Sequence, residues 1–168
     1  MAKQNTTTKP KSGRVKEPGT VKLFLTSERT HFVIGLIICI CTIYIGLALI
    51  SFFFTGGADQ SKIENVENWT GVRGAYLSDL LMNRWFGISS FIILFFLGVV
   101  GTRLMKLSKI PLLKSFLFSA ALIIWGSLFF AFFFIKGYED TFIYLGGQHG
   151  YFLSEFLIKN IGIPGTVL

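Results

Sequence analysis

Three long stretches of this sequence contain no charged residue, and they limit the possible folds more than any other feature. The first runs from Phe32 to Phe54, the second from Trp85 to Thr102 and the third from Ser115 to Ile135. As an α-helix the first stretch would be about 34 Å long, enough to cross a hydrocarbon core of about 30 Å. We therefore expect each stretch to cross a bilayer as a helix.

The composition agrees with a lipid environment. Charged residues make up 15% of the chain, whereas a typical soluble domain has about 25%. The chain also contains 19 Phe residues, too many to bury inside a protein of 168 residues. A secretory signal peptide is the alternative for the first stretch, but its apolar region would be about 7–15 residues long and followed by a small-residue cleavage site. Phe52–Phe54 is no such site. These observations predict an all-α membrane protein.

The distribution of basic residues predicts the orientation of the chain. If the N-terminus is cytoplasmic and each stretch crosses once, eleven of the sixteen Lys and Arg residues are cytoplasmic and five lie on the opposite side. Such a bias is typical of cytoplasmic segments. The eleven residues are Lys3, Lys9, Lys11, Arg14, Lys16, Lys22, Arg29, Arg103, Lys106, Lys109 and Lys114. Residues 1–24 are polar and basic, and we predict a flexible cytoplasmic tail. A tail that also contacts anionic lipid or DNA is the alternative.

The crossings lie in a transmembrane domain that we place at residues 25–168. We predict transmembrane helices over residues 32–54, 85–105 and 113–135. Residues 161–168 are apolar again, but as a helix they reach only about 12 Å, less than half of a bilayer. We expect these residues to begin a truncated fourth helix, which further residues of a longer protein complete on its way back to the cytoplasm.

An internal repeat lies between the crossings. Residues 71–84 (GVRGAYLSDLLMNR) and 147–160 (GQHGYFLSEFLIKN) match at an offset of 76 residues, with Gly, Gly, Leu, Ser and Leu in common. Each copy follows a crossing on the non-cytoplasmic side and leads through a Gly into the next crossing, as a repeated hairpin-like unit would. We predict two short helices, 72–84 and 148–160, which lie on the outer leaflet or re-enter it.

Small residues lie on one face of each predicted repeat helix. This helix-packing motif consists of Gly71, Gly74, Ser78, Gly147, Gly150 and Ser154. Small residues in such a pattern let helix backbones approach closely where no water drives association. We predict that the two copies pack through these faces about a pseudo-two-fold axis. The alternative is a pair of independent interfacial helices in which the glycines serve as turn residues.

The residues that could act as nucleophiles, acids, bases or metal ligands do not form a recognisable reactive centre. There is no G-x-x-x-x-G-K-[ST] phosphate loop and no clustered Cys/His site. Cys39 and Cys41 point to nearly opposite faces of a helix and cannot form a disulfide with each other. His149 occupies the position of Arg73 in the repeat, so we expect a structural role for it. The crossings contain no ionisable residue in their interiors, which argues against a transporter. We expect no catalytic residue, cofactor or metal in this chain.

The repeat resembles the N-terminal four-helix transmembrane domain of the FtsK/SpoIIIE family of bacterial DNA translocases. The resemblance rests on residues 68–87 (NWTGVRGAYLSDLLMNRWFG) and 147–162 (GQHGYFLSEFLIKNIG), followed by Ile163-Pro164-Gly165-Thr166, and it covers about residues 25–168. It implies a fourth helix, a cytoplasmic linker and a hexameric motor that uses ATP and Mg²⁺ to pump double-stranded DNA.

The same resemblance implies a cellular role. The protein would be a multi-pass protein of the bacterial inner membrane at the division septum, coupling chromosome segregation to cell division. The membrane domain would tether and oligomerise the motor and contact other cell-division membrane proteins, with DNA bound only by the motor. A stand-alone membrane scaffold or small transporter is the alternative. A Walker A motif encoded several hundred residues beyond Leu168 favours the translocase, and an early stop favours the alternative.

Overall fold

The computed structural model describes residues 27–61, 66–134 and 142–167, and every regular element in them is helical. The elements are the α-helices α2 (Glu28–Ser61), α3 (Gly71–Asp79), α4 (Phe91–Leu104), α5 (Leu112–Phe134) and α6 (Gly147–Val167), the π-helix η1 (Leu80–Trp85) and the 3₁₀-helix η2 (Gly87–Ser90). The predicted all-α membrane class is confirmed. The predicted tail at residues 1–24 lies outside the described residues.

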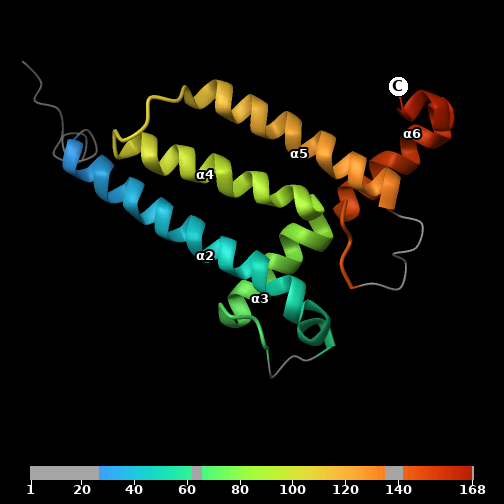
Figure 1. The fold of residues 1–168 in the computed structure, drawn as a ribbon, viewed down its shortest axis with the longest axis horizontal. Coiled ribbons are helices and arrows are strands. Elements are labelled where there is room, and N and C mark those ends of the chain that lie inside the picture. Colours follow the sequence, from blue (N-terminus) through green and yellow to red (C-terminus); the bar gives the residue numbers. More distant parts are fainter. Residues whose placement is uncertain (1–26, 62–65, 135–141, 168) are drawn as a thin grey trace, which may run out of the picture.

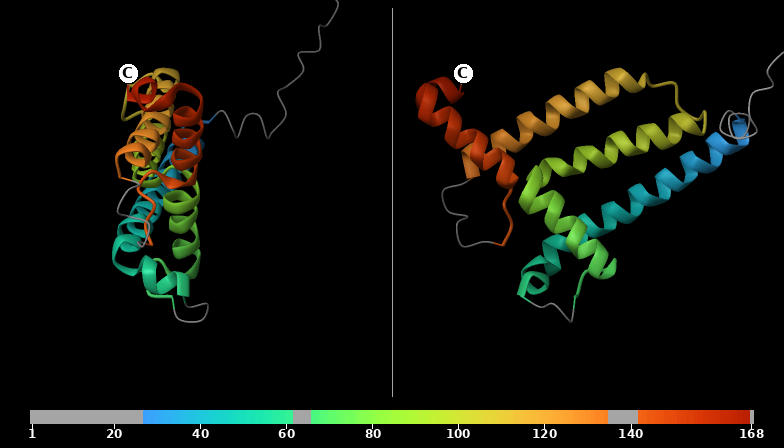
Figure 2. Two further views of the ribbon diagram at one scale, coloured as in Figure 1. Left: turned by 90° about the vertical axis from the view of Figure 1, so that its right-hand side faces the viewer. Right: turned by 180° about the vertical axis from the view of Figure 1, so that it is seen from behind.

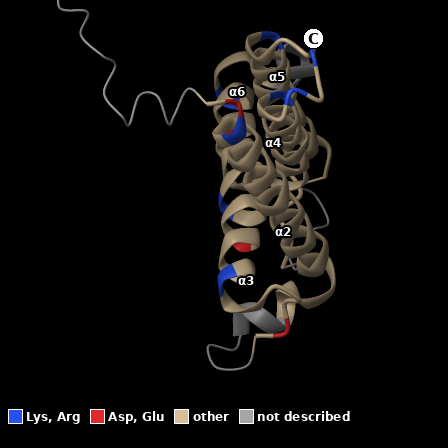
Figure 3. Cartoon of the chain, turned by 90° about the vertical axis from the view of Figure 1, so that its left-hand side faces the viewer, with Lys and Arg blue, Asp and Glu red and all other residues tan. Residues whose placement is uncertain are grey.

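Among the described residues, three helical segments are long and apolar enough to cross a membrane: Glu28–Gly57, Gly87–Leu104 and Leu112–Phe134. Each is hydrophobic on all sides, which is typical of a helix surrounded by lipid. Large apolar side chains point outward along them, and Phe54 is 75% exposed. Charged residues are so sparse that most of the ribbon in Figure 3 is tan. The second segment begins at Gly87 because Trp85, where we expected it to begin, still belongs to η1.

The three long helices lie side by side in one layer, with α4 between α2 and α5 (Figure 1). At one end of this layer, α3–η1 and α6 run across the long helices, one after the other (Figure 2). The helix α3 packs on α2, and α6 packs on α5. Each repeat helix therefore lies against the crossing that precedes it in the chain.

The opposite end of the layer is formed by well-capped helix termini. Ser27 caps α2, because its Oγ accepts a hydrogen bond from the Thr30 N–H at 3.3 Å. At the end of α4, Lys106 has φ = 60°, and the Leu107 N–H donates to the Thr102 carbonyl at 2.9 Å, as in a Schellman motif. Pro111, which has no N–H to lose, directly precedes α5.

A small apolar core joins α2 to η1 and consists of Leu49, Phe52, Leu81 and Met82. The side chains of Phe52 and Met82 are almost fully buried. Partly buried side chains at the start of the second crossing, including Ile88 and Phe91, pack against this core. The core thus fixes the angle at which the first repeat helix leaves the long-helix layer.

The last helix, α6, is broken at Gly162, which has φ = 74° and ψ = 170°. Residues 163–167 continue in helical conformation after this break. The break separates the predicted repeat helix 148–160 from the residues with which we expect a fourth crossing to begin.

Candidate functional site

Four glycines with positive φ mark the ends of the two repeat copies. Gly71 and Gly147 begin the copies with φ of 73° and 66°, and Gly87 and Gly162 end them with φ of 64° and 74°. Glycine adopts this conformation readily because it has no Cβ. The sequence repeat is therefore also a repeat of backbone conformation.

The same turn precedes both copies. The Gly71 N–H donates to the Asn68 carbonyl at 2.8 Å, and the Gly147 N–H donates to the Tyr144 carbonyl at 2.9 Å. These two turns are again 76 residues apart. Residues 68–70 (NWT) and 144–146 (YLG) share no residue type, so the sequence contained no signal for this part of the repeat.

The π-helix η1 explains why the first copy is longer by one residue. Gly87 follows Gly71 by 16 positions, whereas Gly162 follows Gly147 by 15. In η1 the Phe86 N–H donates to the carbonyl of Leu81, five residues earlier, at 3.1 Å. A π-bulge accommodates one additional residue within a helix.

The additional residue is Asn83. Before the bulge Leu81 matches Leu157, and after it Arg84 matches Lys159. This leaves Met82 and Asn83 opposite the single residue Ile158. Met82 and Ile158 are both apolar, so Asn83 has no counterpart in the second copy.

The Asn83 side chain fixes the segment that leads into α6. It is buried, with 5% of its surface exposed. Its Nδ2 donates to the Phe142 carbonyl at 3.0 Å and to Asp79 Oδ1 at 2.9 Å, and its Oδ1 accepts a hydrogen bond from the Tyr144 N–H at 3.0 Å. Sequence reasoning missed this residue. The only signal for it was that the first copy is one residue longer than the second.

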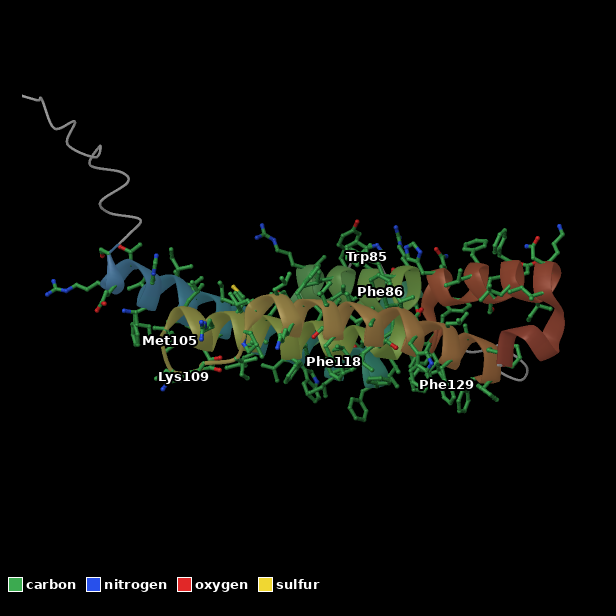
Figure 4. All side chains as sticks on the ribbon, turned by 90° about the horizontal axis from the view of Figure 1, so that it is seen from above. Trp85, Phe86, Met105, Lys109, Phe118 and Phe129 are labelled. Carbon is green, nitrogen blue, oxygen red and sulfur yellow. The ribbon has the colours of Figure 1, made fainter. Side chains whose placement is uncertain are left out.

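The end of the first copy contacts the beginning of the second. The Ile88 N–H donates to the Leu145 carbonyl at 2.8 Å. A Cβ at Gly87 would overlap that carbonyl, and a Cβ at Gly147 would overlap the carbonyl of Trp85. Figure 4 shows Trp85 and Phe86 where the ribbon of the first copy meets α6. We call this set of contacts the internal junction.

One aromatic contact completes the internal junction. The Phe86 ring stacks on the His149 ring, with centroids 5.5 Å apart and an angle of 20° between the ring planes. The contact is consistent with the structural role expected for His149. The two copies therefore follow one another head to tail, which differs from the expected pseudo-two-fold arrangement.

The residues of the helix-packing motif contact other segments and not, as we predicted, the other copy of the motif. A Cβ at Gly74 would overlap the side chain of Thr70 in its own turn, and a Cβ at Gly150 would overlap the Ser127 carbonyl of α5. Ser78 and Ser154 are buried, and their hydroxyls donate to carbonyls of their own helices. The small face of α6 thus receives the backbone of α5 and not the small face of α3. Gly71 and Gly147 act as turn residues, as in the alternative reading.

Hydroxyl groups of the crossings hold both turns in place. The Tyr44 hydroxyl of α2 donates to the Thr70 carbonyl at 3.0 Å, and the Ser127 hydroxyl of α5 donates to the equivalent carbonyl of Gly146 at 2.5 Å. Asn68 adds a second link in the first copy, because its Nδ2 donates to the Ala48 carbonyl at 3.2 Å. In each copy the turn is therefore fixed to the crossing before it.

Comparison with known proteins identifies the family. Residues 27–168 match the family described as the 4TM region of the DNA translocases FtsK and SpoIIIE. The chain belongs to this family. A DNA translocase FtsK from Shewanella oneidensis is 39% identical over 97 residues, which cover 56% of this chain and 10% of that relative. No solved structure matches the chain. The resemblance stated from residues 68–87 and 147–162 is confirmed.

The FtsK/SpoIIIE chain has one further notable feature, a cavity of about 450 Å³ between α5 and α6. Its walls are mainly aromatic and aliphatic, including Phe86, Ile124, Phe152 and Phe156. In the first copy, the start of the second crossing packs against Leu81 and Met82 of the apolar core. The matching residues of the second copy, Leu157 and Ile158, do not line this cavity. Among the described residues, no group of three or more His, Cys, Asp or Glu is placed to hold a metal ion.

Proposed function

We propose that this chain is the membrane anchor of a septal DNA translocase that couples chromosome segregation to cell division. The observation that supports it most is the family match over residues 27–168 together with three apolar helices of membrane-crossing length. The chain spans 10% of the length of its FtsK relative. We place the ATP- and Mg²⁺-dependent DNA motor in the rest of the protein, so that the membrane domain tethers and oligomerises that motor.

The proposed orientation has the N-terminus in the cytoplasm of the cell and the repeat helices on the other side of the inner membrane. The start of α2 lies at the same end of the layer as the α4–α5 connection, where Figure 4 shows Met105 and Lys109. Lys106 in this connection forms an ion pair with Glu28 of α2, with Nζ 2.5 Å from Oε1. Basic residues gather at this end, which favours the cytoplasmic side.

The proposed contacts with other division proteins would use the repeat helices. Tyr76, Phe152 and Phe156 are each more than 60% exposed there. Aromatic side chains are enriched where a membrane meets water, and they are also enriched in the buried centres of protein interfaces. These residues are therefore suited to the outer interface of the membrane, where membrane-embedded partners are accessible.

A fourth crossing would complete the domain. The start of the second crossing packs against the core of the first copy, so the helix that follows Gly162 would pack at the corresponding place in the second. That place is the face of α6 that carries Leu157 and Ile158, which match Leu81 and Met82 of the core. A helix there would return the chain to the cytoplasm, where the motor needs to be.

Localisation of the full-length protein tests the proposed role. A fluorescent fusion should form a band at mid-cell, and cells lacking the protein should trap DNA in the closing septum. The control replaces residues 27–168 by an unrelated domain with the same number of crossings. This chimera should reach the membrane but not the septum. An even distribution of the native fusion around the cell would refute the septal role.

Cysteine labelling tests the orientation separately. In the full-length protein with Cys39 and Cys41 changed to Ala, Leu107→Cys lies in the α4–α5 connection and Val72→Cys lies in the first repeat helix. Both native side chains are exposed, by 71% and 65%. A membrane-impermeant maleimide should label Val72→Cys in spheroplasts and Leu107→Cys only after lysis. The reverse pattern would overturn the orientation.

A further inference from the structure

The head-to-tail repeat leaves one half of a junction without its partner. We call residues 68–73 and 144–149 the heads of the two copies, and residues 84–87 and 159–162 the tails. At the internal junction the second head receives the first tail, and a Cβ at Gly147 would overlap the Trp85 carbonyl. At the equivalent Gly71, nothing lies within 4 Å of the Cβ position. The first head is thus built like the second but is open.

The surface of the first head is exposed. Trp69 is 62% exposed and Val72 is 65% exposed. Gly71 is exposed, whereas Gly147 is buried by the internal junction. The turn of the first head is nevertheless fixed from behind, because the Trp69 N–H donates to Ser51 Oγ of α2 at 3.0 Å. A fixed turn with an exposed outer surface requires little reorganisation on binding.

The second tail ends at a glycine with positive φ, as the first tail does at the internal junction. Gly162 has φ = 74°, close to the 64° of Gly87. Ile161 occupies the position of Phe86 and is 58% exposed. Arg73 occupies the position of His149 and is also exposed. The two side chains that stack at the internal junction therefore have exposed counterparts on the first head and the second tail.

We propose that the first head binds the second tail of another copy of this chain, so that neighbouring chains repeat the internal junction. This inference deepens the oligomerising role proposed above and rests on it. Ile161 of one chain would pack on Arg73 of the next, as Phe86 stacks on His149 within one chain. The N–H that follows Gly162 would donate to the Trp69 carbonyl, as the Ile88 N–H donates to Leu145.

Such an interface is heterologous, because it joins two different surfaces of identical chains. Heterologous contacts form a ring when the rotation between neighbours closes, and a filament when it does not. Asn83 has no counterpart in the second copy, so the joint between chains lacks the amide hydrogen bonds that fix the internal junction. The chains are therefore easier to separate than the two copies within one chain.

Crosslinking between differently tagged copies of the full-length protein tests this proposal in native membranes. With Cys39 and Cys41 changed to Ala, one tagged copy has Arg73→Cys and the other has Ile161→Cys. A short bifunctional maleimide should join them into a heterodimer. The matched internal control is a single chain with Phe86→Cys and His149→Cys, which should be crosslinked within the chain. Tyr76→Cys with Phe152→Cys, exposed residues outside the heads and tails, should not be crosslinked between chains.

A blocking substitution gives the second measurement. Gly71→Leu fills the open position on the first head, so it should abolish the crosslink between Arg73→Cys and Ile161→Cys. The crosslink between Phe86→Cys and His149→Cys in the same chain should persist and thereby report that the domain still folds. Persistence of the intermolecular crosslink in the Gly71→Leu protein would overturn the proposal.

Other outcomes distinguish this proposal from the proposed function. Dominant crosslinks between two Arg73→Cys chains would indicate a symmetric contact, which overturns the head-to-tail interface but leaves an oligomeric anchor. If single-molecule photobleaching counts oligomers but positions 73 and 161 are not crosslinked, the head-to-tail interface is likewise overturned and an oligomeric anchor remains. Monomers at the septum by that count would refute both the interface and the oligomerising role.

Discussion

Gly35 of α2 directly faces Gly101 of α4. A Cβ at Gly35 would lie 2.6 Å from the Gly101 carbonyl oxygen, and a Cβ at Gly101 would lie 2.5 Å from Cys39 Sγ. Two helices that approach so closely need small residues at the contact, because lipid supplies no hydrophobic force to hold them together. This contact joins the first two crossings.

Gly101→Leu should separate α2 from α4 and lower the free energy of unfolding by about 1–3 kcal/mol, the usual cost of an overpacked site. Gly98→Leu is the matched control, because nothing lies within 4 Å of its Cβ position on the same helix. Denaturant unfolding of the two variants in nanodiscs gives the comparison. Equal stability of both variants would contradict the close contact.

Asn83→Ala should loosen the segment before α6. The change removes the buried amide that binds Phe142 and Tyr144, and unsatisfied backbone groups cost about 1–3 kcal/mol each. We expect faster hydrogen exchange at the Tyr144 amide. Asn160→Ala is the control, because this exposed amide donates to the Phe156 carbonyl in its own helix. Unchanged exchange at Tyr144 in the Asn83→Ala protein would refute the role of Asn83.

Gly147→Ala should destabilise the domain more than Gly71→Ala. Both positions have positive φ, which costs a residue with a Cβ about 1–2 kcal/mol. Only at Gly147 does the new methyl group also meet backbone, that of Trp85 and Gly87. Thermal unfolding of the solubilised monomer should rank the native protein first and Gly147→Ala last. A reversed ranking would show that the internal junction is not closely packed.

Glu28→Gln should leave stability unchanged within experimental error. The carboxylate pairs with Lys106, but the two side chains are 81% and 64% exposed, and exposed ion pairs contribute little because water and salt screen them. The midpoint of unfolding should therefore agree with that of the native protein at both low and high salt. A clear, salt-dependent loss of stability would mean that this pair is shielded in the membrane.

The crossings were predictable because lipid imposes a simple rule on sequence. Helices that face hydrocarbon need uninterrupted apolar residues, so the runs from Phe32 and Ser115 were visible without any structure. The repeat was visible for a related reason. Gly71 and Gly147 need a conformation that glycine adopts most readily, and the buried Ser78 and Ser154 accept only small side chains.

The partners of these residues were not predictable from the sequence. The spacing of small residues shows that something approaches each helix closely, but not which segment does so. At Gly150 the approaching group is the α5 backbone at Ser127, and at Gly74 it is the side chain of Thr70. The positions of the two copies in the sequence were equally compatible with a pseudo-two-fold pair and with a head-to-tail series.

The sequence by itself thus determined the lipid-facing helices, the family and the two glycine-bounded copies, because each of these follows from local conformation or solvent. The tertiary structure alone decided that the copies follow one another in the same direction. The physical reason is the π-bulge at Asn83, which fixes the segment before α6 against η1 through long-range hydrogen bonds. Contacts between residues about 60 positions apart in the chain have no signature in local composition.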